Sequence, residues 1–182
     1  MERILVSSCM AGRPVRYDGA AKPVAGGHFE RWRKEGRLVP FCPEISGGLA
    51  VPRAPAEIVG GTGGDVLDGT ARILTGTGTD VTDEFLRGAR LALETARRTG
   101  ARTALLKEGS PSCGSHRIYD GTFTGAKRPG TGVTTALLQR AGITVFSESE
   151  LEAVQAHLTA LERASHPEKA PHGTADKSGT HH

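Results

Sequence analysis

The apolar residues of this chain follow two patterns that alternate from one end to the other. Short continuous apolar runs are typical of buried strands, whereas apolar residues three or four positions apart are typical of helices. The expected strands span residues 3–7, 38–41, 104–106 and 143–146. The expected helices span residues 28–35, 82–98, 131–140 and 147 to about 164. Because parallel strands need a crossover between them, this alternation predicts an α/β fold: a Rossmann-like, mostly parallel sheet with helices on both faces.

Local start and stop signals support two of these helices. Thr82 can cap the helix over residues 82–98, whose first turn is acidic and which Gly100 ends. Ser147 and Glu150 have the spacing of a capping box, which predicts the start of the last helix.

The segments between these elements are rich in glycine and proline. Residues 42–57 contain three prolines and two adjacent glycines, a composition that predicts a rigid irregular wall rather than a helix. Residues 66–74 predict a small hairpin insertion with Asp68 and Gly69 at its tip. The glycine clusters beside it lack the residues of a P-loop or dinucleotide site, so a hairpin is preferred to a phosphate cradle. Residues 119–132 are expected to form a long polar turn region.

The length and composition predict a single domain. A chain of 182 residues is typical of one domain with a substantial core, and all the predicted elements lie within residues 1–164. Residues 165–182 are rich in Pro, Lys, Gly, Thr and His and contain no apolar anchor, which predicts a disordered tail. Four of the seven histidines lie in this tail, so they are poor candidates for catalysis.

The charge balance and the cysteine count narrow the class of protein. The formal net charge is +3, with both signs interspersed, so a nucleic-acid backbone binder is not indicated. No apolar run approaches the length of a membrane span, and we expect no membrane partner. An odd number of cysteines and the absence of a leading signal peptide predict a reducing, cytoplasmic location. The sequence makes no prediction of oligomeric state.

Each of the three cysteines follows a predicted strand. Cys9, Cys42 and Cys113 lie in loops that begin where an apolar run ends. Ligands of open parallel sheets bind outside the carboxyl ends of the strands, where all three thiols are expected. A buried structural cysteine is the ordinary alternative for any one of them. Three soft thiolates are suited to zinc, copper(I) or an iron–sulfur cluster, and three protein ligands leave one coordination position open.

Polar residues near the cysteines are the candidate partners of such a centre. Glu44 is expected beside the open position as general acid or base, with a helix cap or salt bridge as its structural alternative. Ser110 and Ser112 are placed to donate hydrogen bonds to a ligand or a cluster sulfur, unless they are ordinary turn residues. Arg16 and Tyr17 lie in a loop that is either an anion- or amide-recognition loop or a solvated surface loop.

Five separated motifs, in this order, resemble those of the thiouracil desulfurase family. The resemblance covers residues 4 to about 148, and the motifs are residues 6–12, 15–19, 42–49 with 52–53, 107–114 and 119–125. The first motif departs slightly from the family pattern, which commonly has Ala followed by Cys-Leu-Leu. This chain has Ser8 before the cysteine and Met10 and Ala11 after it, which leaves the ligand in place and changes a wall of the pocket.

The resemblance implies a [4Fe-4S] cluster held by Cys9, Cys42 and Cys113, with the fourth iron free to bind the sulfur of a thiocarbonyl substrate. It places Glu44 and Ser110 beside that substrate. The implied reaction is a non-redox desulfuration that converts the C=S of a thiolated nucleobase such as 2-thiouracil to C=O and releases sulfide. The expected partner is thus a small thiolated nucleobase, with thiolated RNA as an open alternative.

Two other functions use the same cysteines. One is a zinc-dependent hydrolase or deaminase of a small heterocycle, although the sequence lacks the local His and Cys spacing of the zinc deaminases. The other is a non-enzymatic protein that carries a cluster as a sulfur carrier or sensor.

Overall fold

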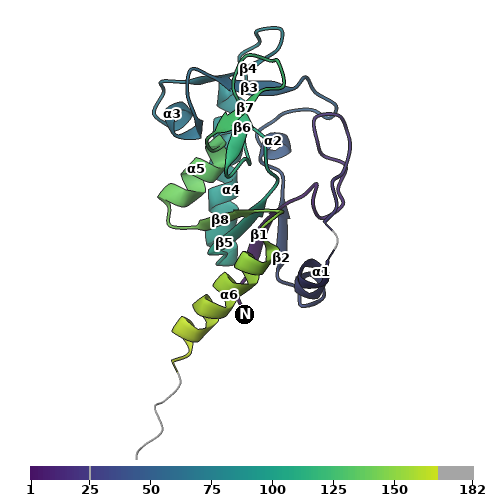
Figure 1. Ribbon diagram of the computed structural model, residues 1–182, viewed down its shortest axis with the longest axis vertical. Coiled ribbons are helices and arrows are strands. Elements are labelled where there is room, and N and C mark those ends of the chain that lie inside the picture. The colour runs from purple at the N-terminus through teal and green to yellow at the C-terminus, as the bar shows by residue number, and fades with distance from the viewer. Residues whose placement is uncertain (25, 168–182) are drawn as a thin grey trace, which may run out of the picture.

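A parallel four-stranded sheet forms the centre of the molecule (Figure 1). The computed structural model describes residues 1–24 and 26–167. The strand order is β2-β1-β5-β8, and all three neighbouring pairs are parallel. The strands are β1 (Ile4–Ser7), β2 (Leu38–Phe41), β5 (Thr103–Leu106) and β8 (Thr144–Ser147). Each lies within one residue of its predicted bounds, because continuous apolar runs mark strands that are covered on both faces.

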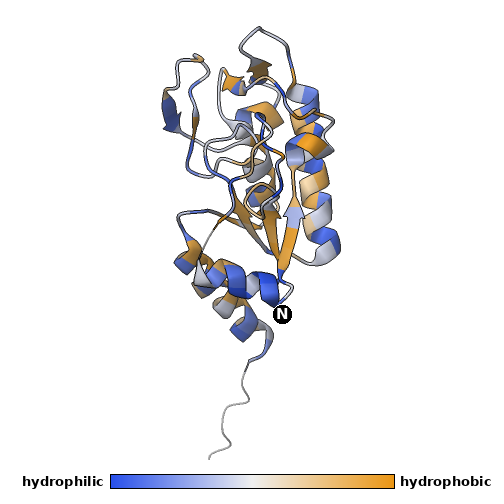
Figure 2. Cartoon of the chain, turned by 90° about the vertical axis from the view of Figure 1, so that its right-hand side faces the viewer, coloured by the Kyte–Doolittle hydropathy of each residue, from blue (hydrophilic) through white to orange (hydrophobic). Residues whose placement is uncertain are grey.

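Helices cover both faces of this sheet. They are α1 (Gly27–Lys34), α4 (Thr82–Thr99), α5 (Val133–Arg140) and α6 (Leu151–Ser165). Successive strand residues point to opposite faces. Leu5 therefore packs with buried residues of α4 and α5, whereas Ile4 and Val6 pack with buried residues of α1 and α6. Figure 2 shows the hydrophobic strands enclosed by these helices. The predicted α/β class, with a parallel sheet between two helical layers, is confirmed.

The irregular wall predicted for residues 42–57 contains one helical turn. Helix α2 (Pro43–Ser46) begins one residue after β2. Pro43 suits its first position, because the proline ring fixes φ near the helical value and the backbone N–H that proline lacks would have no partner within the helix. The helix packs closely on α4: a Cβ atom on Gly88 would lie 1.9 Å from the carbonyl oxygen of Pro43. The prediction of a wall without helix was wrong at this turn, which is the part that carries a candidate site residue.

The predicted hairpin over residues 66–74 is also wrong. Its first half belongs to α3 (Gly63–Leu67), which a capping box between Thr62 and Asp65 starts. Its second half is β4 (Arg72–Thr75), which pairs antiparallel with β3 (Ala56–Val59) rather than with its own neighbours. The capping signal at residues 62–65 outweighs the turn signal at Asp68 and Gly69, which instead follow the helix end.

Besides the β3–β4 hairpin, a second hairpin lies within residues 119–132 and just before them, where a polar turn region was expected. Strands β6 (Arg117–Tyr119) and β7 (Lys127–Pro129) pair antiparallel. The two hairpins lie side by side beyond the carboxyl ends of the central strands (Figure 1), where Glu57 of β3 accepts hydrogen bonds from the N–H groups of Gly121 and Phe123. In place of one small hairpin at residues 66–74, the structure has two hairpins, β3 with β4 and β6 with β7.

Helix α4 begins at Thr82, as predicted, but with another cap, and α6 begins four residues later than predicted. Val81, not Thr82, is the N-cap of α4, because the buried Thr82 hydroxyl accepts the N–H of Ile73 on β4 at 2.9 Å. The Glu150 carboxylate accepts the N–H of Ser147 at 3.0 Å, as a capping box requires, but this contact closes the turn that precedes α6.

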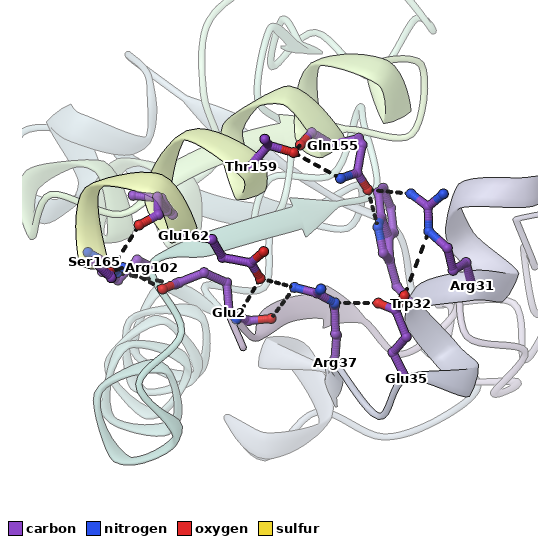
Figure 3. Close-up of polar contacts among 11 residues, drawn as sticks. Glu2, Arg31, Trp32, Glu35, Arg37, Arg102, Gln155, Thr159, Glu162 and Ser165 are labelled. Carbon is purple, nitrogen blue, oxygen red and sulfur yellow. Dashed lines mark hydrogen bonds and ion pairs between the residues drawn. The ribbon is translucent and has the colours of Figure 1, made fainter. Parts of the chain in front are cut away.

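Contacts at the amino ends of the strands fasten α6 to the sheet (Figure 3). The Gln155 side-chain oxygen accepts the indole N–H of Trp32 at 2.9 Å, and Glu162 accepts from Arg37 at 2.5 Å. These contacts lie opposite the cysteine-bearing ends. Within residues 1–24 and 26–167, no helix has the length and apolarity needed to cross a membrane. The tail predicted over residues 165–182 lies outside the described residues from residue 168 onward.

Candidate functional site

A cleft of about 700 Å³ opens at the carboxyl ends of β1, β2 and β5. The two hairpins form its far wall, through residues such as Glu57, Thr75 and Tyr119. The cleft is lined by all three cysteines, as their positions after successive strands predict. A parallel sheet brings these loops together because its strands all end at one edge.

The three thiols are free and share one electrostatic environment. Burial raises the pKa of each of them, and the charge of Cys42 raises the pKa of both Cys9 and Cys113 further. All three thiols thus lie in one cleft and affect one another through charge. In the described part of the chain, no three His, Cys, Asp or Glu side chains converge as ligands of a single metal ion.

Glu44 faces the cleft from the first turn of α2. Its negative charge raises the pKa of Cys42 and of Cys113. It also forms a 2.6 Å ion pair with the buried guanidinium of Arg53. The structural alternative for Glu44 is confirmed, since its carboxylate is in a salt bridge. The same side chain lines the cleft, and its role as acid or base stays a prediction.

The two serines of the third cysteine loop have different surroundings. Ser110 lines the cleft, and its oxygen accepts the N–H groups of Ser112 at 3.0 Å and Cys113 at 3.3 Å. The hydroxyl proton of Ser110 is thereby left for another acceptor. Ser112 is fully buried, and its hydroxyl pairs with that of Thr134 at 2.7 Å. The structure thus places Ser112 behind the cleft wall, where it supports the loop and does not face the cavity.

Arg16 and Tyr17 also line the cleft. The Arg16 guanidinium lies 6.0 Å from the centroid of the Tyr17 ring, and its charge lowers the pKa of Cys9. The loop therefore brings a cation and a phenol to the cleft, with Tyr17 itself exposed, and its role in recognition stays a prediction.

Comparison with known proteins identifies the family of this chain. The model of the 2-thiouracil desulfurase family matches residues 4–150, which include all three cysteines and the residues of the cleft. The chain belongs to the 2-thiouracil desulfurase family. It is 50% identical over 148 residues, 81% of this chain and 97% of the other, to YbbK of Bacillus subtilis strain 168, which is described as uncharacterized.

A solved protein structure that is similar to this chain supports the fold assignment. It is described as the [4Fe-4S]-dependent thiouracil desulfidase TudS. The two structures superpose with a TM-score of 0.81 at 49% sequence identity, over 88% of this chain and 99% of that chain. The predicted family and the predicted fold class are both confirmed.

Several residues of the site have no simple signal in the sequence. Ser7 ends β1, and its hydroxyl accepts the N–H of Lys107 at 2.9 Å and bonds to the thiol of Cys113. Lys107 lines the cleft and pairs with Glu148, while its charge lowers the pKa of Cys9. A polar residue at the end of an apolar run was the one available hint for Ser7. Its partners lie about a hundred residues away and are fixed only by strand order.

Glu108 holds the cysteine loop of this 2-thiouracil desulfurase family member in place. One carboxylate oxygen accepts the N–H groups of Ser115, His116 and Arg117, at 2.9, 3.0 and 3.0 Å, and the other accepts the Ser115 hydroxyl at 3.0 Å. Burial raises the pKa of Glu108, but these bonds outweigh it and keep the pKa below its ordinary value. The hydrogen bonds of this carboxylate therefore fix the two ends of the loop over residues 108–117, which carries Cys113.

The Glu108→Gln variant is expected to lose about 2 kcal/mol of unfolding free energy at pH 7, because a charged acceptor of several hydrogen bonds is removed. A lowered pKa means that the stabilisation is present above the ordinary value of 4.5 and is lost as the pH falls below it. Urea unfolding from pH 7 to pH 3 should therefore show the gap between wild type and variant narrowing below pH 4.5 and closing as the pH falls through the lowered pKa of the folded state. Glu94→Gln, on the exposed face of α4, is the matched control. A gap that stays constant with pH would contradict the assignment.

Proposed function

We propose that this chain is a thiouracil desulfidase that converts a thiocarbonyl of a small thiolated nucleobase to a carbonyl and releases sulfide. The observation that carries the proposal is one cleft lined by three free thiols and by Glu44. Membership of the 2-thiouracil desulfurase family and the likeness to TudS support the same activity and a [4Fe-4S] cofactor.

The donor set in the cleft fits such a cluster. Cys9, Cys42 and Cys113 supply three thiolates from three loops, and iron–sulfur clusters are held by cysteine thiolates. The three thiols line one cleft, and none of the described residues that line it is a histidine. A bound cluster with three protein ligands would supply one iron as a Lewis acid for the sulfur of a thiocarbonyl.

The residues of the chain then supply binding and proton transfer. Glu44 accepts a proton from the water that attacks the ring carbon and returns it to the departing sulfur as the carbon–sulfur bond breaks. The Ser110 hydroxyl donates a hydrogen bond to the bound ring. Arg16 and Tyr17 bind the polar edge of the base. One water is consumed and one hydrogen sulfide is released for each C=S converted to C=O, with no net transfer of electrons.

A small molecule is the substrate that the charge distribution favours. The chain has a net charge of +3, and two of the five cations that line the cleft, Lys107 and Arg53, are already paired with carboxylates. Thiolated RNA needs an extended basic surface that the mixed charges do not provide. Buried free thiols also fit a reducing compartment, and we place the protein in the cytoplasm.

An anaerobic assay of the reconstituted protein tests the proposal. We expect a brown protein with iron and sulfide in near-equal amounts, which turns over 2-thiouracil and releases one sulfide per uracil formed. Stoichiometric zinc without iron would favour the hydrolase, and bound cluster without turnover of any thiobase would favour a carrier or sensor. A parallel screen of thionucleosides and thiolated tRNA tests the substrate, since activity on tRNA alone would overturn the small-molecule assignment.

A further inference from the structure

The Arg53 side chain lies at the junction of three segments that wall the cleft. Only 8% of it is exposed. One guanidinium nitrogen donates to the carbonyl of Ala50 at 3.0 Å and the other to the carbonyl of Val15 at 3.1 Å. The backbone N–H of Arg53 donates to the carbonyl of Tyr17 at 2.7 Å. Arg53 thus joins its own segment to the loop that carries Arg16 and Tyr17.

The same guanidinium holds the candidate base. The nitrogen that donates to Val15 also donates to the Glu44 carboxylate at 2.6 Å. Glu44 stands on a helix of four residues, which by itself does little to limit the rotamers of its side chain. A planar fork with fixed donor directions restricts the carboxylate far more than a lysine ammonium on a flexible stem would.

We propose that Arg53 is a positioning residue, which holds the Glu44 carboxylate and the Arg16–Tyr17 loop in a fixed relative position at the wall of the cleft. The inference rests on the proposed desulfidase function for its catalytic consequence. A displacement of about 1 Å of a reacting group can cost about 10²-fold in rate, so the position of Glu44 has a large effect. Arg53 needs no contact with the substrate for this role.

A double-mutant cycle tests the link to Glu44. In the wild-type background, Arg53→Ala is expected to lower kcat for 2-thiouracil by about 10²-fold. In the Glu44→Gln background, where no base remains to be positioned, the same substitution is expected to change kcat less than about threefold. Iron and sulfide content and the visible spectrum should match the wild type. A merely structural role would instead lower kcat by the same factor in both backgrounds, and that result would overturn the proposal.

Rescue with small cations tests the geometry of the guanidinium. Methylguanidinium at millimolar concentration is expected to restore at least tenfold of the lost kcat of Arg53→Ala, whereas methylammonium is not. Arg53→Lys is expected to stay close to Arg53→Ala, because lysine keeps the charge and loses the fork. Equal rescue by both cations, or full activity of Arg53→Lys, would show that charge alone is needed and would overturn the positioning role.

Tryptic cleavage after Arg16 is a readout that does not depend on activity. Without Arg53, the loop loses its contacts at Val15, and cleavage after Arg16 is expected to be about tenfold faster than in wild type. Cleavage after the exposed Arg98, at the end of α4, is the internal control and should not change. A wild type without desulfidase activity would refute the proposed function but leave this measurement valid. An unchanged rate of cleavage after Arg16 would refute the role of Arg53.

Discussion

The Glu44→Gln variant is expected to lower kcat for 2-thiouracil by about 10²–10⁴-fold, the range that a positioned general acid or base contributes. Glutamine has nearly the same shape and still accepts the hydrogen bond that Arg53 donates to Glu44. It cannot take a proton from water, so binding should survive while proton transfer is lost. Steady-state assays of anaerobically reconstituted protein should show a fall in kcat with KM changed less than about threefold.

The control for this variant is an exposed glutamate with the same substitution. Glu94→Gln, on the solvent side of α4, should keep both kcat and KM. Iron and sulfide content must be equal in the three proteins, so that a loss of cluster is not taken for a loss of catalysis. Turnover of 2-thiouracil by Glu44→Gln at the wild-type rate would exclude Glu44 as the proton acceptor.

Replacing any one of the three cysteines by serine is expected to abolish turnover together with the iron content. The chain has no other cysteine, so each single substitution leaves two thiols in the cleft. Two thiolates from separate loops are too few to hold a cluster that is normally bound by three or four. Cys9→Ser, Cys42→Ser and Cys113→Ser should each give a colourless protein with activity at the level of a no-enzyme blank.

Removal of iron from the wild type separates loss of the cluster from loss of folding. Chelator-treated wild-type protein should lose its activity and recover it after anaerobic reconstitution, whereas the three serine variants should not recover. Far-UV circular dichroism should agree among all four, because serine differs from cysteine by one atom. A variant that retains full iron and sulfide would show that its cysteine is not a ligand.

The sequence predicted the central sheet because the signal for it is local. Each buried strand is a continuous apolar run, and its ends are visible without knowledge of any partner. The ends of three such runs also located Cys9, Cys42 and Cys113, since parallel strands deliver their carboxyl ends to one edge. Residues 66–74 were misassigned because two local signals compete there. The capping box of Thr62 and Asp65 starts a helix and prevails over the turn signal of Asp68 and Gly69.

The partners of the cleft residues were decided only by the tertiary structure. The sequence by itself determined a parallel α/β fold, three thiols at one edge and a carboxylate beside them. It did not show that Arg53 holds Glu44, that Ser7 bonds to Lys107 and Cys113, or that Ser112 turns away from the cavity. Hydrophobic periodicity records which face of an element is buried, whereas a hydrogen bond between distant loops exists only once the strand order has brought them together.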